Sequence, residues 1–394
     1  MEKLTLLILV LAGSSAFSSD INNPKKAAHP KTIHTQETLR VGADSGDDFV
    51  WFGTQLSLDV NSKGTMYVAD PGNTRIAVIG SDGAFVQSIG AKGAGPGEFQ
   101  VVTGVCVLND DRIVVTDVFG PSTKVHFFQP DGTYIETKQP VFGTIFTNVK
   151  PNYDASLYGG LYVTFDQANA KMKFVAGTLD ATFQPISTAA EAIRSTPDFT
   201  RFGEGAYWSE YMGENFRILK DTAVFVFDRK GNRYDAVINQ YHIKITPNGS
   251  DYALIVTKDY EPIYNAPEEI EAFVEPTRDA IVEQLPPNLK GIVTHAVIKK
   301  AMELAEFPQV KQPIFGLLPM DRGFAVVHDI SYTKQTQFLD LFNDKGQLIG
   351  DWAVKGLGPN PFAPSLIFRD QSIYRFERND DGEFDLVRYG YEIK

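Results

Sequence analysis

Residues 64–99, GTMYVADPGNTRIAVIGSDGAFVQSIGAKGAGPGEF, hold three short β-rich runs divided by the turn residues of PGNT and SDG. The run QLSLDV (55–60) stands directly before them. Four similar runs follow Phe99, namely VVTGVCVL, RIVVTD, KVHFFQ and TYIETK, with the turn PDG before the last. Asp, Asn and Gly at such turns suit tight hairpins. Repeated groups of four short antiparallel strands predict the blades of a β-propeller.

The glycine-rich end of this stretch, GAKGAGPGEF (90–99), recurs as KGLGPNPF (355–362). Glycines also occur in phosphate-binding loops, but those need Lys and then Ser or Thr directly after the last glycine, whereas Gly97 precedes Glu98. Each copy follows one β-rich run and precedes another. We therefore expect a crossing from the last strand of one blade to the first strand of the next, with Phe99 and Phe362 packed between blades.

Counting these groups gives six blades, which start near residues 52, 100, 142, 213, 308 and 361. The sixth group supplies only three strands, and the run ETLRVG before the first blade has no assigned place. We expect residues 36–42 to pair as the outer strand of blade six, because this would remove an open sheet edge. The sequence thus predicts an all-β fold: a six-bladed β-propeller with four-stranded antiparallel blades and a helical-hairpin insertion.

The first blade resembles an NHL-type repeat, in which a Tyr-Val-x-Asp strand end is followed by Asn-x-Arg-Ile-x-Val and a final Gly-x-Gly-Pro-Gly-x-Phe. The matching residues are Gly64, Tyr67, Val68, Asp70, Asn73, Arg75, Ile76, Val78, Asp82, Gly83, Gly95, Pro96, Gly97 and Phe99. The second blade keeps Asp117 but has Ser122-Thr123-Lys124 in place of Asn-x-Arg. The whole chain is similar to bacterial secreted six-bladed propellers that carry this repeat.

Asp70 and Arg75 lie at the end of one predicted strand and the start of the next. A carboxylate beside a guanidinium could bind a substrate, or it could hold the hairpin together. The Asp recurs as Asp117 in the second blade, and a catalytic residue need not recur in every blade. We therefore expect a structural role for Asp70, Arg75 and Asp117.

The termini and the composition limit the possible partners. Residues 1–16 read as an export signal peptide, with Lys3 before a short apolar run and small residues at its end. Residues 17–35 look like a flexible linker, which leaves 36–394 as the propeller of a secreted or periplasmic monomer without a transmembrane span. A net charge of −12 disfavours nucleic acid as a partner. The single cysteine, Cys106, has no disulfide partner within the chain and is expected in the core.

Catalysis is left open but is not the favoured reading. Some propellers similar to this chain are metal-dependent lyases or lactonases with ligands on the inner strands. None of the histidines falls on a predicted inner strand; they are His29, His34, His126, His242, His295 and His328. We expect no metal, no cofactor and no assignable catalytic residue. A metal-dependent lyase or lactonase-type hydrolase acting at the central channel remains the alternative.

Two insertions interrupt the repeat, at residues 187–215 and 266–307, and the second has the pattern of two helices. Both join a fourth strand to the next blade. They therefore share one face, termed here the loop-rich face, with the glycine crossings and the turns from second to third strands; the opposite side is the plain face. We expect Arg201, Tyr207, Trp208 and Tyr211 to form a recognition patch there. The favoured function is non-enzymatic binding of a protein, peptide or carbohydrate of the cell envelope.

Overall fold

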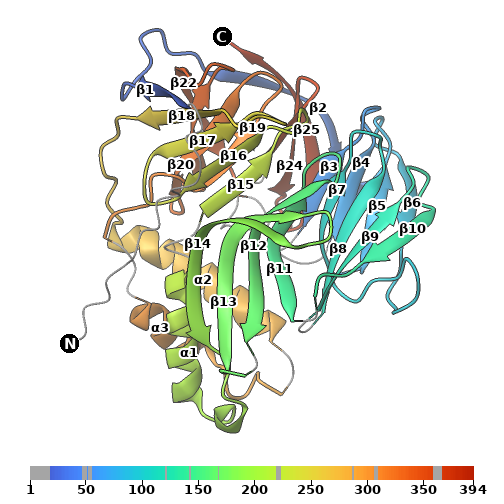
Figure 1. Cartoon of the computed structure of the whole chain (residues 1–394), viewed down its shortest axis with the longest axis vertical. Coiled ribbons are helices and arrows are strands. Elements are labelled where there is room, and N and C mark those ends of the chain that lie inside the picture. Colours follow the sequence, from blue (N-terminus) through green and yellow to red (C-terminus); the bar gives the residue numbers. More distant parts are fainter. Residues whose placement is uncertain are drawn as a thin grey trace.

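The computed structural model confirms the all-β six-bladed propeller (Figure 1). It describes residues 18–46, 51, 56–119, 122–141, 143–166, 168–218, 223–285, 288–305, 309–357 and 366–394. The expected signal peptide, 1–16, and Phe362 lie outside the described residues.

Blades 1 to 3 each contain four antiparallel strands, placed in chain order from the axis outward. Blade 1 comprises β3 (Ser57–Val60), β4 (Met66–Asp70), β5 (Arg75–Ile79) and β6 (Phe85–Ile89). Blade 2 comprises β7 (Val102–Val107), β8 (Ile113–Phe119), β9 (Ser122–Phe128) and β10 (Tyr134–Lys138). Blade 3 has longer strands: β11 (Thr144–Pro151), β12 (Leu157–Asp166), β13 (Lys171–Asp180) and β14 (Pro185–Ser195).

Blades 4 and 6 each take a strand from the N-terminal part of the chain. Blade 4 comprises β15 (Ala223–Phe227), β16 (Arg233–Val237), β17 (His242–Thr246), β18 (Ala253–Lys258) and β1 (Ser18–Asn23). Blade 5 comprises β19 (Gly316–Pro319), β20 (Phe324–Ser331), β21 (Thr336–Phe342) and β22 (Leu348–Lys355). Blade 6 comprises β23 (Leu366–Arg369), β24 (Ser372–Arg378), β25 (Phe384–Ile393) and β2 (Ile33–Val41), which the short 3-10 helix η1 (Ala43–Ser45) follows.

The predicted ring closure is confirmed. Strand β2 pairs antiparallel with β25, from Ile33 opposite Ile393 to Val41 opposite Leu386. The strand starts slightly earlier than the expected residue 36. The C-terminal strand β25 and the N-terminal strand β2 therefore lie side by side in blade 6, and the fourth strand that the C-terminal part of the sequence lacks comes from the N-terminal part.

The segment expected to be a flexible linker is ordered as part of the sheet edges. Strand β1 pairs parallel with β18, and the side-chain amide of Asn23 donates to the carbonyl of Gly346 at 2.9 Å. The Lys31 amide donates to the Ile349 carbonyl of blade 5 at 2.9 Å. Residues 18–41, termed the strap, thus run along the outer edges of blades 4, 5 and 6. The sequence does not indicate this pairing, because SSDINN and its polar surroundings have low strand propensity, which the open edge of β18 overrides.

The glycine crossing also behaves as predicted. Gly90 and Gly97 have φ of 74° and 75°, a conformation that glycine adopts easily. A Cβ on Gly90 would come within 2.2 Å of the Phe99 ring. Phe99 is fully buried among side chains of blades 1 and 2, including Tyr67 and Phe128. The loop therefore places the Phe99 side chain between blades 1 and 2.

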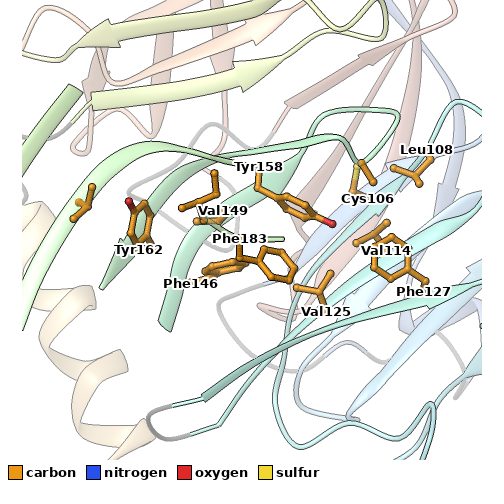
Figure 2. Close-up of a cluster of buried hydrophobic side chains, with 13 residues drawn as sticks. Cys106, Leu108, Val114, Val125, Phe127, Phe146, Val149, Tyr158, Tyr162 and Phe183 are labelled. Carbon is orange, nitrogen blue, oxygen red and sulfur yellow. The ribbon is translucent and has the colours of Figure 1, made fainter. Parts of the chain in front are cut away.

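Apolar clusters of this kind fill the spaces between blades. Figure 2 shows the cluster between blades 2 and 3, where Phe146, Tyr158 and Phe183 gather beside Cys106. Cys106 is buried as expected, and burial raises the pKa of its thiol far above the ordinary value. Such a thiol stays protonated at neutral pH and behaves as a small apolar side chain.

Three helices form one group on the loop-rich side (Figure 1). They are α1 (Gly205–Ile218), α2 (Pro267–Gln284) and α3 (His295–Leu304), with the short 3-10 helix η3 (Phe199–Arg201) before α1. The second insertion is a helical hairpin, as predicted. Of the first insertion, residues 187–195 belong instead to β14, because β13 offers a ten-residue edge to pair with. Tertiary pairing here overrides the helix preference of an alanine-rich segment.

Candidate functional site

The aromatic residues predicted to form a recognition patch lie inside the helical group. Tyr207 and Trp208 are 8% and 9% exposed, and they pack with Val293, Ile298 and Met302 in one apolar cluster. Tyr211 is partly buried against the same cluster. The picture of an exposed aromatic patch therefore needs correction. These rings face inward because α1 packs along α3, and the repeat pattern of the blades gives no information about that contact.

Hydrogen bonds inside the helical group also hold Tyr207 and Trp208 in place. The Tyr207 hydroxyl accepts a hydrogen bond from the Asp198 amide at 2.6 Å, and the Trp208 indole donates to the Phe202 carbonyl at 2.9 Å. Arg201 remains exposed at the edge, where its guanidinium lies 4.8 Å from the centre of the Tyr207 ring and 2.9 Å from a Glu204 carboxylate oxygen. Arg201 is thus the one member of the predicted patch with an open, charged side chain.

Asp70 and Arg75 hold the β4–β5 connection together, as their expected structural role requires. The Arg75 Nε donates to the fully buried Asp70 carboxylate at 3.2 Å. Asp117 accepts instead from the backbone amides of Gln100 and Val101, directly before β7. Burial opposes ionisation of Asp117, but contacts from His126 and these amides prevail and lower its pKa. Both carboxylates therefore bind backbone or neighbouring side chains on the loop-rich face.

The channel is crossed at its plain end by one arginine. Arg229, in the turn between β15 and β16, donates to the Asp59 carboxylate at 2.9 Å and to the Val60 carbonyl at 2.8 Å. Its guanidinium also lies 4.0 Å from the centre of the Tyr153 ring of blade 3. Asp59 is the only acidic residue on the described inner strands. Its carboxylate is thus occupied by Arg229.

The histidines lie away from the axis in the described part of the chain. His328 falls within β20 rather than after it, and His242 starts β17. His126 lies on β9, where its Nδ1 and the Thr137 hydroxyl share a hydrogen bond. Among the described residues, no group of three or more His, Cys, Asp or Glu side chains is arranged to hold a metal ion. His328 lines a small cavity that is described below.

Two chain segments connect the helical hairpin to the propeller. Residues 259–265 leave β18, and residues 309–315 return to β19; together they are termed the neck. The Lys311 amide donates to the Ile263 carbonyl at 2.7 Å, and the Asn265 amide donates to the Gln309 carbonyl at 2.8 Å. At the start of α2, Glu269 accepts from the Tyr332 amide at 2.7 Å. The hairpin is therefore tied to blade 5 as well as to the neck.

A polar cavity of about 30 Å³ lies beneath the neck, between blades 4 and 5. It is lined by Tyr241, Lys258, Tyr260, Glu261, Ile263, Lys311, Gln312, Pro313 and His328. Lys258 donates to a carboxylate oxygen of Asp340 at 2.6 Å, and the Tyr241 hydroxyl donates to the same oxygen at 2.5 Å. Lys311 donates to Asp329 at 2.7 Å. Two buried ion pairs therefore stand side by side at this junction.

Burial shifts the pKa values of two groups that line the cavity, Tyr241 and His328. Burial, together with the Asp340 charge, raises the pKa of the Tyr241 hydroxyl well above its ordinary value. Burial lowers the pKa of His328, although Asp340 lies 3.9 Å from its Nε2. At neutral pH the phenol of Tyr241 and the imidazole of His328 are therefore uncharged.

Exposed apolar side chains gather on the loop-rich face. Tyr264 is 69% exposed on the neck, and Phe119 is 61% exposed at the end of β8. The large exposed apolar residues at this face are Val101, Phe119, Val141, Val237, Tyr260, Ile263, Tyr264 and Val310. Four of them belong to the neck, and two of these four, Tyr260 and Ile263, line the polar cavity. The neck thus combines an apolar surface with a small polar cavity on a rigid support.

No local pattern in the sequence indicates the neck as a site. Lys258 and Asp340 are 82 residues apart, and Lys311 follows a helix at a position without a motif. His328 was the only cavity residue considered as a ligand. Lys258 ends an otherwise apolar strand, but the same pattern is expected of a lysine that faces solvent.

A family model described as a 6-bladed beta-propeller, DUF5128, matches residues 55–200. The matched segment spans blades 1 to 3. No curated protein matches the chain. None of the described helices is long and apolar enough to cross a membrane.

Three solved structures are similar to the chain. A candidate exported protein from Bacteroides fragilis aligns over 95% of this chain and 100% of its own, at 12% identity and a TM-score of 0.50. A DUF4221 family member from Bacteroides vulgatus covers 92% and 98%, at 9% identity and a TM-score of 0.48. The PQQ-bound aldose sugar dehydrogenase of Streptomyces coelicolor covers 93% and 100%, at 9% identity and a TM-score of 0.44. At these identities the likeness concerns the fold alone.

Proposed function

We propose that this chain is an exported, monomeric binding protein that holds a protein, peptide or glycan of the cell envelope on its loop-rich face. The neck is the centre of the contact. The observation that carries this proposal is the gathering of exposed apolar side chains at that face, with Tyr264 and Tyr260 the largest on the neck. Exposed aromatic anchors on a rigid support are typical of recognition surfaces.

Two further features support the proposal. The expected signal peptide in residues 1–16 implies export. The residues of the first blade that fit an NHL-type repeat, such as Asp70 and Arg75, act in the fold and leave the loops free to vary. We therefore assign the repeat to the scaffold and the binding to the neck.

Replacement of both neck tyrosines tests the proposal. The variant Tyr260→Ser/Tyr264→Ser should retain its melting temperature and lose most binding to immobilised envelope extract from the producing cells. The matched control is Tyr252→Ser, which removes a tyrosine that is 38% exposed on the plain face. Retained binding in the double variant, or equal loss in the control, would show that the neck is not the contact.

A further inference from the structure

The outer side of blade 3 is an open strand edge. Strand β14 forms it with 11 residues, whereas the outer strands β6 and β10 of blades 1 and 2 have 5 residues each. The strap pairs with β18 and contacts β22, but no strand pairs with the outer side of β14 in the part of the chain that the structure describes (Figure 1). Such an edge presents backbone N–H and C=O groups without strand partners.

The register of β14 against β13 determines which backbone groups face outward. The Thr196 amide donates to the Ala170 carbonyl at 3.0 Å, so these two residues form a hydrogen-bonded pair directly beyond the strands. Hydrogen-bonded and open pairs alternate along an antiparallel ladder. The ladder has no register shift from Ser195 back to Glu191. Glu191, Ile193 and Ser195 therefore direct their backbone groups away from β13.

The side chains of this edge favour one kind of added strand. Ile193 is 57% exposed and offers an apolar contact across the edge. Arg194 lies on the opposite face, where it forms no ion pair with any described residue. Its Nη1 donates instead to the Ile193 carbonyl at 3.0 Å. An acidic side chain opposite Arg194 would bind the guanidinium and free that carbonyl for an added strand.

The other charges at this end of the three outer strands offset one another. Lys173 binds Glu191 at 2.6 Å. Lys171 of β13 lies opposite Asp166 of β12 in the ladder. These four charges balance in number, and Arg194 adds one positive charge at the edge. An acidic strand therefore fits this edge better than a basic one.

Blade 4 shows that an outer edge of this propeller takes up an added strand. Strand β1 pairs parallel with β18 over Ser18–Asn23 and makes the sheet five-stranded. The sequence of β1, SSDINN, has low strand propensity. Backbone pairing with a free edge thus orders a segment that has no strand-forming pattern of its own.

We propose that residues 190–195 of β14 bind an extended segment of a partner protein as an added strand of blade 3. The segment has an apolar side chain beside Ile193 and an acidic side chain opposite Arg194. Strand addition of this kind gains affinity from main-chain hydrogen bonds and specificity from alternate side chains. The site lies on blade 3, whereas the neck joins blades 4 and 5. It is therefore a second contact surface, and it does not depend on the proposed function.

A short peptide probes this edge on the folded protein. The probe is acetyl-Glu-Val-Thr-Val-Thr-Val-Glu-amide with a fluorophore, and its binding is followed by fluorescence anisotropy. One matched peptide has lysine in place of both glutamates. A second carries N-methyl groups on the central Val-Thr-Val, which removes backbone donors while the side chains stay the same. The acidic probe should bind saturably, the lysine peptide more weakly, and the N-methylated peptide least.

Amide hydrogen exchange, measured by NMR on the unaltered protein, locates the bound probe. In the free protein the amides of Glu191, Ile193 and Ser195 should exchange fast, because they face outward. Those of Ala192 and Arg194 should exchange slowly, because they are bonded to β13. The probe should slow exchange at the three outward amides.

Substitutions at two positions separate backbone pairing from side-chain contact. Ile193→Pro removes an outward N–H and no hydrogen bond to β13, and proline is tolerated at such edge positions. It should keep its melting temperature and bind the probe at least about tenfold more weakly. Ile193→Val retains the amide and should bind as the unaltered protein does. Arg194→Gln should bind the acidic and the lysine peptides about equally.

The unaltered protein decides the question even if a variant fails to fold. The proposal is wrong if the probe does not bind, if it leaves the three outward amides unprotected, or if the N-methylated peptide binds equally well. Equal binding of the lysine peptide to the unaltered protein would overturn the acidic partner. Tyr260→Ser/Tyr264→Ser should bind the probe normally, because the neck is a separate surface. Loss of probe binding in that variant would place the peptide at the neck and overturn the site on β14.

Discussion

Phe99 fills the space between blades 1 and 2, where its ring lies 5.9 Å from that of Phe128 and 5.3 Å from that of His126. Phe99→Ala should lower the free energy of unfolding by about 3 kcal/mol, because it removes a fully buried ring. Denaturant unfolding measures this loss. Phe119→Ala, at a side chain that is 61% exposed, is the matched control and should change stability little. An unchanged midpoint for Phe99→Ala would contradict the assigned role of the glycine crossing.

His328 makes stability depend on pH. Its folded pKa is lowered by burial and Lys258, against the opposing charges of Asp340, Asp329 and Asp351. The unfolded chain therefore takes up a proton near its ordinary pKa of 6.5 that the folded chain does not. Stability is complete above this value and decreases as the pH falls from about 7 toward the lowered folded pKa.

His328→Asn removes this titration and tests it. The stability of the unaltered protein should fall relative to the variant between about pH 7 and 5.5, as followed by denaturant unfolding at each pH. Carboxylates with lowered pKa values, such as Asp117 and Glu269, lose their contribution at lower pH, below the ordinary carboxyl range. A constant difference between the two proteins across this window would mean that His328 titrates normally in the folded state.

At the scale of elements, the strap is the part that the sequence analysis described least well. Asn23 donates to the Gly346 carbonyl and accepts from the Leu348 amide at 2.7 Å, so it joins β1 to blade 5. Asn23→Ala should lower the melting temperature by several degrees, as loss of buried hydrogen bonds does. Asn22→Ala, at the exposed neighbouring side chain, is the control. A melting temperature for Asn23→Ala equal to that of the unaltered protein would contradict this role of Asn23.

The helical group forms a small core of its own. Trp208→Ala should loosen it, because the indole packs 4.8 Å from the Phe202 ring and 5.9 Å from the Tyr207 ring. We expect faster hydrogen exchange in α1 and α3, while the blades keep their protection. Glu204→Ala alters an exposed side chain of the same segment and serves as the control. Unchanged exchange in Trp208→Ala would contradict a core role for the indole.

Local signals explain which elements the sequence could predict. Turn residues such as those of SDG recur in several blades, so most strands and the ring closure through β2 follow from local pattern and count. The pairing of β1 with β18 joins residues more than two hundred positions apart, and no local pattern encodes it. The same holds for the packing of Trp208 against α3. Aromatic residues in an insertion fit an exposed patch and a buried core equally well, and only the tertiary contact decides.

At the scale of the whole molecule, the two faces of the propeller differ. Arg229 crosses the axis at the plain end, and short turns cover the rest of that side. The loop-rich face carries the helical group, the neck and the exposed apolar side chains. A partner that needs both an apolar surface and a small polar cavity finds them together at the neck. The two faces differ because both insertions leave the blades on the loop-rich face.

The central claim is that the neck contacts the partner, and photochemical crosslinking tests it most directly. A photoreactive p-benzoylphenylalanine replaces Tyr264 in one protein and Tyr252, on the plain face, in another. After irradiation in envelope extract, the residue-264 protein should yield a discrete crosslinked product. Excess unaltered protein should suppress it, while Tyr260→Ser/Tyr264→Ser should not. A product at residue 252 alone, or equal products at both positions, would contradict binding at the neck.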